Sequence, residues 1–477
     1  MKFTVLSHAS LLVESNNGKK LLCDPWLIGS SYWRSWWNYP PVKRELIENL
    51  IPDVVYITHI HWDHFHGPSL EKFPKDTKII VPKRNYDRNK KDLINLGFNN
   101  VHELKHGESY KIDDDFEITS YQFGIFLDSA VLISCDNARL LNLNDSKHMG
   151  PTLNQIVKNH NPIDFIFRSH SSANSRMSYQ FIDEDNTHSD DNEKYIEDFF
   201  YTAMATGAKY AIPFASNHCH LHKDSWHYNN FVQTPLAVKD YFSKKETNIE
   251  LKIMVSGDSW DTNKGFEIEN HDFFTNREQR LSEYRAKNQE KLDAFYKQED
   301  NTKINKKLVE RYYKDLSKRI PYFVKKKIKN TFFTYVLHTH AKPAYIFNIN
   351  ISEGKVNLID KETDLDFDNY PIQIHTTAFI FLRCIGFKIF SHMSIGKRVF
   401  YKLKKKDEGK MQLVNLIYNL EEYDMLPISR IFSICKNCFP SVFSRNLNLL
   451  GENESGEVLF KKFFSGFLHL SFPNCFP

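Results

Sequence analysis

The sequence has few of the features that mark disulfide-stabilised or membrane-spanning proteins. Only 7 of its 477 residues are cysteine, and such an odd, scattered set is typical of a reducing compartment. Arg383 and Lys388 interrupt its most apolar stretch, Thr377 to Ile395, which is therefore expected to form a buried or amphipathic helix. The first residues also lack the apolar core of a secretory signal. We therefore expect a cytoplasmic protein with no membrane span.

The sequence also lacks an excess of one charge. Its 63 basic and 59 acidic residues give a net charge of +4, which is too small to predict nucleic-acid binding. The composition, 41% hydrophobic and 26% charged, excludes disordered and collagen-like chains. A chain of this length is expected to form two or three domains, with one large domain equally allowed.

Two cysteine-based metal sites are missing. No Cys-x-His pair is followed by a Cys-x-x-His pair, the ligand pattern of a Rieske iron–sulfur centre. Cys435 and Cys438 form a single Cys-x-x-Cys with no second pair at zinc-ribbon spacing. We assign that pair no role.

The first 150 residues predict short strands separated by turns and helices. Asn17-Gly18 and Asp136-Asn137 each lie between two apolar runs, and such dipeptides favour type I′ hairpins because both positions tolerate a positive φ. Compact apolar runs such as Val54 to Ile57 alternate with helical stretches, which predicts layered α/β packing.

Composition divides the chain into three parts. Residues 1–265 carry the alternating strands and helices and are expected to form the first domain. Residues 266–330 are rich in Lys, Glu, Gln and Tyr, a pattern typical of solvated helices, and form a basic helical segment. Residues 331–477 are expected to form a C-terminal α+β region of unknown role.

Three imidazoles and a carboxylate lie within six residues, directly after the strand predicted at Val54 to Ile57. In an extended segment, residues two apart point the same way, so His59 and His61 can converge on one cation while Asp63 and His64 face an adjacent position. These ligands suit Zn, Fe or Mn. The alternative is a histidine-rich surface loop, because the chain contains 21 histidines. Type, spacing and position favour a metal site.

This segment resembles the metallo-β-lactamase superfamily, whose His-x-His-x-Asp-His motif follows a buried strand. The resemblance implies an α/β protein with the αβ/βα sandwich of that superfamily, here with a helical insertion and a smaller C-terminal α+β region. Within the superfamily, the sequence is similar to the metallo-β-lactamase portion of CMP-N-acetylneuraminate hydroxylases. The matching segments are His8 to Val13, Leu21 to Gly29, Trp36-Trp37, Leu141 to Asp145, and Pro213 to Ala215 with His222.

The resemblance implies a dinuclear centre. One metal would be held by His59 and His61 and a second by Asp63 and His64, with Asp145 bridging them. Asp63 and Asp145 would be the catalytic carboxylates. For Asp145, the alternative is a turn or cap carboxylate at the end of a strand.

The sequence departs from the superfamily pattern in one ligand of the first metal. Relatives usually supply a further histidine before the position of Asp145, but the stretch Tyr121 to Asp128 contains none. Gln122, Asp128 or His148 could take its place, and each is equally explained as an ordinary turn or surface residue.

The last ligand is also displaced. His222 fits the hydroxylase-like pattern best and is expected to bind the second metal, with His218 and His220 as alternatives. His170 and His188 are candidates for lining the pocket, or simply capping and exposed histidines.

Three functions are compatible with these residues. The resemblance implies hydroxylation of a small molecule, a sugar or nucleotide-sugar, by two irons, with a separate electron-transfer protein as partner. The second is a zinc-dependent hydrolase of a phosphodiester, amide or lactone, in which Asp63 or Asp145 steers the proton. The third is a degenerate, non-catalytic binding protein. Metal content distinguishes the three functions. Iron would indicate the hydroxylase, zinc the hydrolase, and no bound metal the binding protein.

Overall fold

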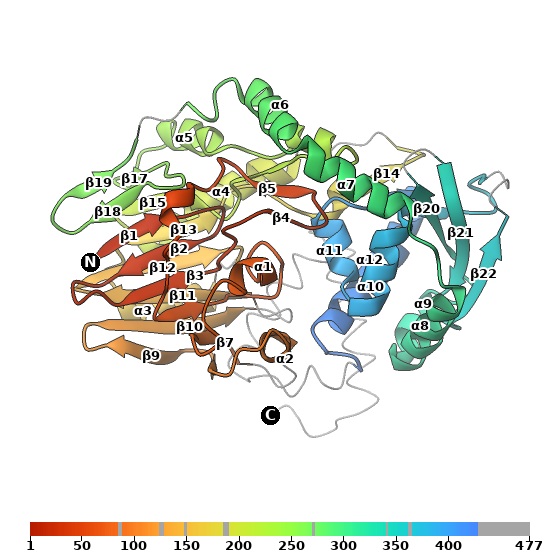
Figure 1. Cartoon of the computed structure of the whole chain (residues 1–477), viewed down its shortest axis with the longest axis horizontal. Coiled ribbons are helices and arrows are strands. Elements are labelled where there is room, and N and C mark those ends of the chain that lie inside the picture. Colours follow the sequence, from red (N-terminus) through yellow and green to blue (C-terminus); the bar gives the residue numbers. More distant parts are fainter. Residues whose placement is uncertain are drawn as a thin grey trace.

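The structure is a computed structural model that describes residues 1–83, 88–123, 128–146, 150–184, 190–269, 272–339, 342–360 and 365–427. Its N-terminal part, up to Glu267, contains two large sheets (Figure 1). The first has the order β19 (Gly265–Glu267), β18 (Ser259–Asp261), β1 (Lys2–Val5), β2 (Leu11–Glu14), β3 (Lys20–Cys23), β6 (Val54–Tyr56), β7 (Lys78–Pro82) and β8 (Val101–Leu104). The second has the order β17 (Glu250–Leu251), β15 (Tyr210–Phe214), β13 (Phe165–Ser169), β12 (Ala138–Asn144), β11 (Asp128–Cys135), β10 (Phe116–Phe123) and β9 (Glu108–Asp113).

The two sheets pack face to face. One apolar core contains Phe3 and Tyr56 from the first sheet together with Ile133 and Phe167 from the second. Strand β11 shows how the sequence produces this arrangement, because side chains alternate across a strand. Val131 and Ile133 enter the core between the sheets, whereas Ala130 and Leu132 enter the core on the outer face. Strands buried on both faces are therefore continuous apolar runs.

Helices cover both outer faces. The first sheet packs against α1 (Gly67–Leu70) and α2 (Arg88–Asn95) through a core that includes Leu70 and Leu93. The second packs against α3 (Pro151–His160), α4 (Asp190–Thr206) and α5 (Pro235–Ser243) through a core that includes Ile156, Phe199 and Val238. The predicted αβ/βα sandwich is confirmed.

The two predicted hairpins differ in their turns. The β11–β12 hairpin pairs Cys135 with Ala138, and the two residues between them have φ of 46° and 67°, as a type I′ turn requires. The β2–β3 hairpin pairs Glu14 with Lys20, so its loop is longer than predicted, and of its dipeptide only Gly18 has a positive φ. The hairpin prediction was right, and the two-residue turn was wrong there.

Four helices follow the sandwich: α6 (Arg277–Lys287), α7 (Gln289–Asp300), α8 (Lys306–Arg319) and α9 (Tyr322–Lys327). Helices α6 and α7 run along the upper edge of the molecule from the sandwich to the C-terminal sheet (Figure 1). Leu281 and Leu292 of these helices share a core with Trp37 and Leu221 of the sandwich. The predicted helices are therefore present, and α6 and α7 pack against the first domain.

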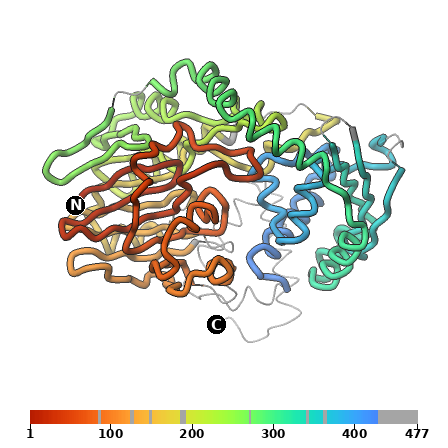
Figure 2. The backbone as a smooth tube through the Cα atoms, in the orientation of Figure 1, coloured from red at the N-terminus to blue at the C-terminus, as the bar shows by residue number. Residues whose placement is uncertain are grey.

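A third sheet lies in the C-terminal part. Its order is β14 (Tyr179–Phe181), β24 (Phe400–Leu403), β23 (Ile372–Thr377), β20 (Phe333–Thr339), β21 (Lys342–Asn350) and β22 (Lys355–Ile359). It packs with α8, α9, α10 (Ala378–Phe387), α11 (Phe390–Ile395) and α12 (Glu408–Glu422) around one large core. Figure 2 shows the cyan and blue C-terminal segments beside the red and orange sandwich. The division at residues 265 and 330 stays a prediction.

A small fourth sheet joins distant segments near the predicted site. It contains β16 (His218–His220), β5 (Trp36–Asn38) and β4 (Ser30–Ser31), and pairs His218 with Asn38. The Thr377 to Ile395 stretch forms α10 and α11 rather than one continuous helix. In the described part of the chain, no helix is both long and apolar enough to cross a membrane. Cys435 and Cys438 lie outside the described residues.

Candidate metal centre

The predicted ligand segment begins where β6 leaves the first sheet. This strand is fully buried between β3 and β7, and beyond it the chain folds into a tight turn in which the His64 and Phe65 amides donate to the carbonyl of His61. The turn reverses the chain after the first two histidines. It therefore separates the motif into two adjacent groups of ligands.

The first group contains His59, His61 and Asp145, whose ligand atoms all lie within 4.8 Å of one another. Nε2 of His59 is 2.9 Å from Nδ1 of His61 and 3.9 Å from Oδ2 of Asp145. Asp145 follows β12, where Asn144 has a φ of 40°, a conformation that asparagine tolerates better than most residues. The structure brings these three predicted residues together.

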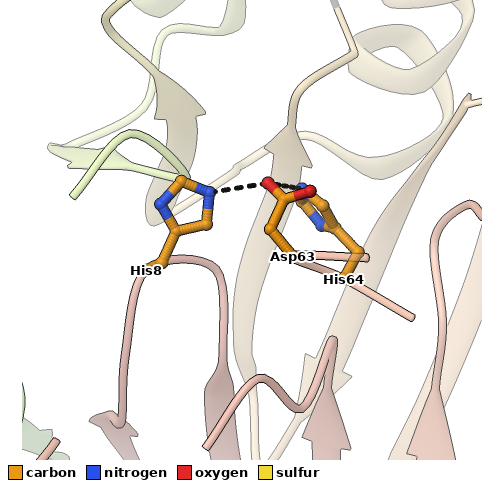
Figure 3. A group of neighbouring side chains, drawn as sticks. All are labelled: His8, Asp63 and His64. Atoms are coloured by element: carbon orange, nitrogen blue, oxygen red, sulfur yellow. Dashed lines mark hydrogen bonds and ion pairs between the residues drawn. The ribbon is translucent and has the colours of Figure 1, made fainter. Parts of the chain in front are cut away.

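The second group contains Asp63 and His64 together with His8 from the turn between β1 and β2 (Figure 3). Oδ2 of Asp63 lies 3.0 Å from Nε2 of His8 and 3.3 Å from Nε2 of His64. All three residues are buried. Asp145 links the two groups, because its Oδ2 is also 3.3 Å from Nε2 of His64. Asp145 thus lies between the two groups, and its role as a bridging ligand stays a prediction.

Asp24 orients histidines of both groups. Its Oδ2 accepts hydrogen bonds from Nδ1 of His64 at 2.8 Å and from the Thr58 hydroxyl at 2.7 Å. Because that hydroxyl donates to Asp24, its oxygen accepts from Nδ1 of His59, 3.0 Å away. With a proton on each Nδ1, Nε2 of both histidines presents a lone pair to the centre, as metal-ligating imidazoles require.

The geometry fits a cation. Nε2 of His64 is buried without a hydrogen-bond partner, yet it faces the carboxylate oxygens of Asp63 and Asp145, each 3.3 Å away. Three acceptors that converge in a buried space repel one another unless a positive charge lies between them. Imidazole and carboxylate are the donors that Zn²⁺ and Fe²⁺ share, so these residues fit the divalent metals that the sequence predicted.

The pKa shifts of His64 and Asp63 also arise from the close approach of imidazole and carboxylate groups in this buried space. Burial alone would lower the pKa of His64, but the carboxylates of Asp63, Asp24 and Asp145 outweigh it and raise that pKa well above its usual value. Burial likewise opposes ionisation of Asp63, yet His64 and His8 hold its pKa well below the usual range. The environment that would hold a proton on His64 also favours a divalent cation in the proton's place.

Of the two substitutes for the missing histidine that the structure describes, Asp128 is the one that acts on a residue of the first group. It is buried at the start of β11 and acts on His61 electrostatically, opposing the lowering of that residue's pKa by burial. Gln122, in contrast, donates its side-chain amide to the carbonyl of Leu104. His148 lies outside the described residues.

The structure does not bring His222 together with either group. Its Nε2 lies 3.2 Å from Oε2 of Glu299 on α7, and the same carboxylate binds Arg398 at 2.7 Å. His218 lies closer to the centre, because its ring centroid is 5.4 Å from that of His8. His220 instead contacts the Ser35 hydroxyl at 3.1 Å.

Of the two remaining histidine candidates, the structure describes only His170, which joins neither ligand group. His170 is buried after β13, and burial lowers its pKa to about 3. His188 lies outside the described residues. Among the described residues, the only groups of three metal-binding side chains are the two given above.

Two parts of the site had little or no sequence signal. His8 was noted only as part of the opening hairpin, although its position at the end of the first strand could have marked it as a ligand. Tyr32, which donates to Oδ1 of Asp63 at 2.5 Å, lies outside any motif. Tyr32 lies between β4 and β5, and the fold of the chain places this segment beside Asp63. The spacing of residues in the sequence does not predict that contact.

Comparison with known proteins finds relatives of part of this chain. The family model for a beta-lactamase superfamily domain matches residues 2–124. The cytidine monophosphate-N-acetylneuraminic acid hydroxylase of Xenopus laevis is 26% identical over 156 residues, covering 30% of this chain and 26% of the relative. The mouse enzyme of the same name is 25% identical over 153 residues, again covering 30% and 26%. The match thus spans about a quarter of these relatives' length.

Solved structures show more distant likenesses. An isothiocyanate hydrolase from Delia radicum gut bacteria is 16% identical, with a TM-score of 0.41, and the match covers 55% of this chain and 99% of that one. CmlA, a diiron beta-hydroxylase from Streptomyces venezuelae, is 16% identical with a TM-score of 0.37, covering 53% of each chain. From the family model and the curated relatives, this chain is related to the metallo-β-lactamase superfamily.

Proposed function

We propose that the protein is a dinuclear metal-dependent enzyme. His59, His61 and Asp145 would hold one ion, and His8, Asp63 and His64 the other. The observation that carries this proposal is the convergence of the buried, unpartnered Nε2 of His64 on two carboxylate oxygens at 3.3 Å.

Iron and a hydroxylation reaction are the first choice. Each group presents two imidazoles and one carboxylate, which is the donor set of non-haem iron oxygenases. Asp128 beside His61 would add a further hard ligand. When bound, two irons would supply the oxygen chemistry that no side chain of the protein can perform alone.

The protein's own residues would hold the site in its active geometry. Asp24 fixes the tautomers of His59 and His64 through the hydrogen bonds described above. The Tyr32 hydroxyl donates to Oδ1 of Asp63 and leaves Oδ2 directed at the two histidines. Burial of these residues excludes water and strengthens each interaction.

The proposed substrate is a small molecule, a sugar or nucleotide-sugar. Support comes from the curated relatives, whose names describe hydroxylation of cytidine monophosphate-N-acetylneuraminic acid. The sequence contains no Rieske ligand pattern. Hydroxylation also needs electrons, and the donor that we propose is a separate electron-transfer protein.

Zinc-dependent hydrolysis is the second candidate. Two histidines and one carboxylate are also the ligand set of a class of catalytic zinc sites, and each group offers that set. Zinc would lower the pKa of a bound water to about 7, and Asp63 or Asp145 would accept its proton. This reaction needs no electron donor.

The deciding experiment is elemental analysis of the full chain purified without added metal. Two irons per chain, with oxygen uptake that depends on a reductant and on a nucleotide-sugar, support the hydroxylase. Two zincs, with hydrolysis of a phosphodiester, amide or lactone, support the hydrolase. Purified protein that binds neither metal when each is supplied contradicts both and leaves the non-catalytic binding protein.

A further inference from the structure

A small pocket lies beside the metal centre, where the segment after β15 meets the beginnings of α5 and α6. The enclosed volume is about 10 Å³, and the pocket is open to solvent on one side. Its wall includes Asn217 and His218, Thr234 at the start of α5, and Arg277 at the start of α6. An enclosed volume of this size holds one water-sized group, such as one oxygen atom of an anion, while the rest of the ligand would lie in the open mouth of the pocket.

Arg277 brings a positive charge without a counterion to this pocket. Its guanidinium donates to the carbonyl of Asn229 at 2.8 Å and lies 5.8 Å from the centre of the Tyr39 ring. Within the described part of the chain, no carboxylate forms an ion pair with it. A partly buried guanidinium is most stable with a bidentate anion, such as a carboxylate or phosphate.

Two neighbouring polar atoms are also without partners. Oδ1 of Asn217 and Nδ1 of His218 have no hydrogen-bond partner, and these residues are only 6% and 5% exposed. Buried polar atoms are nearly always hydrogen-bonded in folded proteins. Both residues line the pocket, so a ligand there could satisfy them, for instance through a hydroxyl group next to its anionic group.

The start of α5 adds a third favourable feature. The helix has 9 residues, and Thr234, its N-cap, makes no side-chain capping bond. The first residue, Pro235, has no amide hydrogen, and the Ala237 amide donates to the carbonyl of Thr234, so it is the positive end of the helix dipole that attracts an anion here. Both the guanidinium of Arg277 and this helix end therefore attract an anion.

We propose that this pocket binds the oxyanion of a small-molecule ligand, a carboxylate or phosphate, through Arg277 and the start of α5. His218 separates the pocket from the second ligand group, because its ring packs 5.4 Å from that of His8. An anion held there would place the rest of the ligand next to the metal centre. That role in substrate binding rests on the proposed function, whereas the binding of an anion does not.

The test measures binding of two probes, inorganic phosphate and glucuronate, to the full chain by isothermal titration calorimetry. The Arg277→Gln variant should weaken binding about tenfold or more, since it removes a charged hydrogen-bond donor. Arg277→Lys keeps the positive charge but loses the two parallel donors of the guanidinium. Its affinity for each probe should lie between those of the wild-type protein and Arg277→Gln. Arg280→Gln is the matched control, because Arg280 lies one turn further along α6 and pairs with Asp272.

Asn217→Asp is an independent variant that preserves shape but adds a negative charge to the pocket, and it should also weaken binding. If glucuronate binds more tightly than phosphate and both depend on Arg277, the site prefers a carboxylate with adjacent hydroxyls. The reverse order indicates a phosphate site. Equal affinity in the wild-type protein and Arg277→Gln, or no binding of either probe, overturns the proposal.

A His61→Ala variant separates this pocket from the metal centre. Phosphate that binds a metal ion would be lost in His61→Ala and kept in Arg277→Gln, and that result also overturns the proposal. Binding that depends on Arg277 in a protein that holds no metal supports the pocket while contradicting the proposed function. Circular dichroism of each variant confirms that it is folded.

Discussion

Nδ1 of His392 and Oε1 of Glu422 are 2.6 Å apart, and neither side chain has any exposed surface. His392 lies on α11 and Glu422 ends α12, so both belong to the C-terminal part of the chain. The ring centroid of His392 is 5.7 Å from that of His61. This contact therefore joins the C-terminal helices to the first candidate ligand group.

Removing one member of the pair should be costly. Glu422→Gln removes the carboxylate that faces the buried imidazole and accepts from the Ser391 hydroxyl, and we expect the free energy of unfolding to fall by about 1 to 3 kcal/mol. Urea denaturation followed by circular dichroism measures the change. Glu353→Gln is the control, because Glu353 is exposed and pairs with Lys355 at the surface. Equal stability of the two variants would show that the pair contributes nothing.

A second prediction concerns pH. Burial opposes ionisation of Glu299, but Arg398 and His222 lower its pKa to about 2, from 4.5. A carboxyl group with a lowered pKa stabilises the fold above its unfolded pKa, and this stability is lost as the pH falls through the folded value. Glu299 should thus contribute about 3 kcal/mol at neutral pH, lost between pH 5 and 2.

The Glu299→Gln variant should be less stable at pH 7 and show a flatter loss of stability over that acidic range. Glu290→Gln on the same helix is the control, because Glu290 is exposed. Denaturation series at several pH values provide the comparison. Parallel pH profiles for Glu299→Gln and the wild-type protein would contradict the prediction.

Asp24 should control metal affinity without being a ligand. Asp24→Asn keeps the shape of the side chain and tolerates the backbone φ of 46° at this position, but it weakens the acceptor that orients His59 and His64. We expect about 10- to 100-fold weaker metal binding, measured by competition with a chelator. Asp53→Asn, which affects a half-exposed surface carboxylate paired with Lys19, should leave affinity unchanged.

Asp128 should complete the first group. Asp128→Asn removes the negative charge that acts on His61, so the affinity of one ion should fall while the other keeps its affinity. A titration that resolves the two ions measures this difference, with exposed Asp115→Asn as the control. If the Asp128→Asn variant binds both ions with unchanged affinity, Asp128 is neither a metal ligand nor a residue that supports a metal ligand.

The sequence predicted those parts of the site that depend on local spacing. His59 to His64 follow one buried strand, and Asp145 ends another, so the positions of both followed from strand ends. The positions of His8 and His222 could not be predicted in this way, because they depend on contacts between residues that are distant in the sequence. His8 reaches Asp63 across 55 residues of sequence, and His222 is turned towards Glu299 by contacts with α7 that only the folded chain reveals.

The hairpins show the same limit in the fold. Asp136-Asn137 adopts the predicted turn because β11 and β12 pair up to Cys135 and Ala138. Asn17-Gly18 has equally suitable residues, but pairing of β2 with β3 stops at Glu14 and Lys20. The length of the β2–β3 loop therefore depends on where strand pairing ends, and the Asn17-Gly18 dipeptide alone does not predict it.

The proposed metal centre is tested by the metal content of three variants purified in parallel: His61→Ala, Asp63→Ala and His222→Ala. The first two should lose bound metal by about tenfold or more, because each removes a member of a ligand group. His222→Ala should keep its metal, because His222 contacts Glu299 instead. Unchanged metal content in both His61→Ala and Asp63→Ala would contradict the proposed centre.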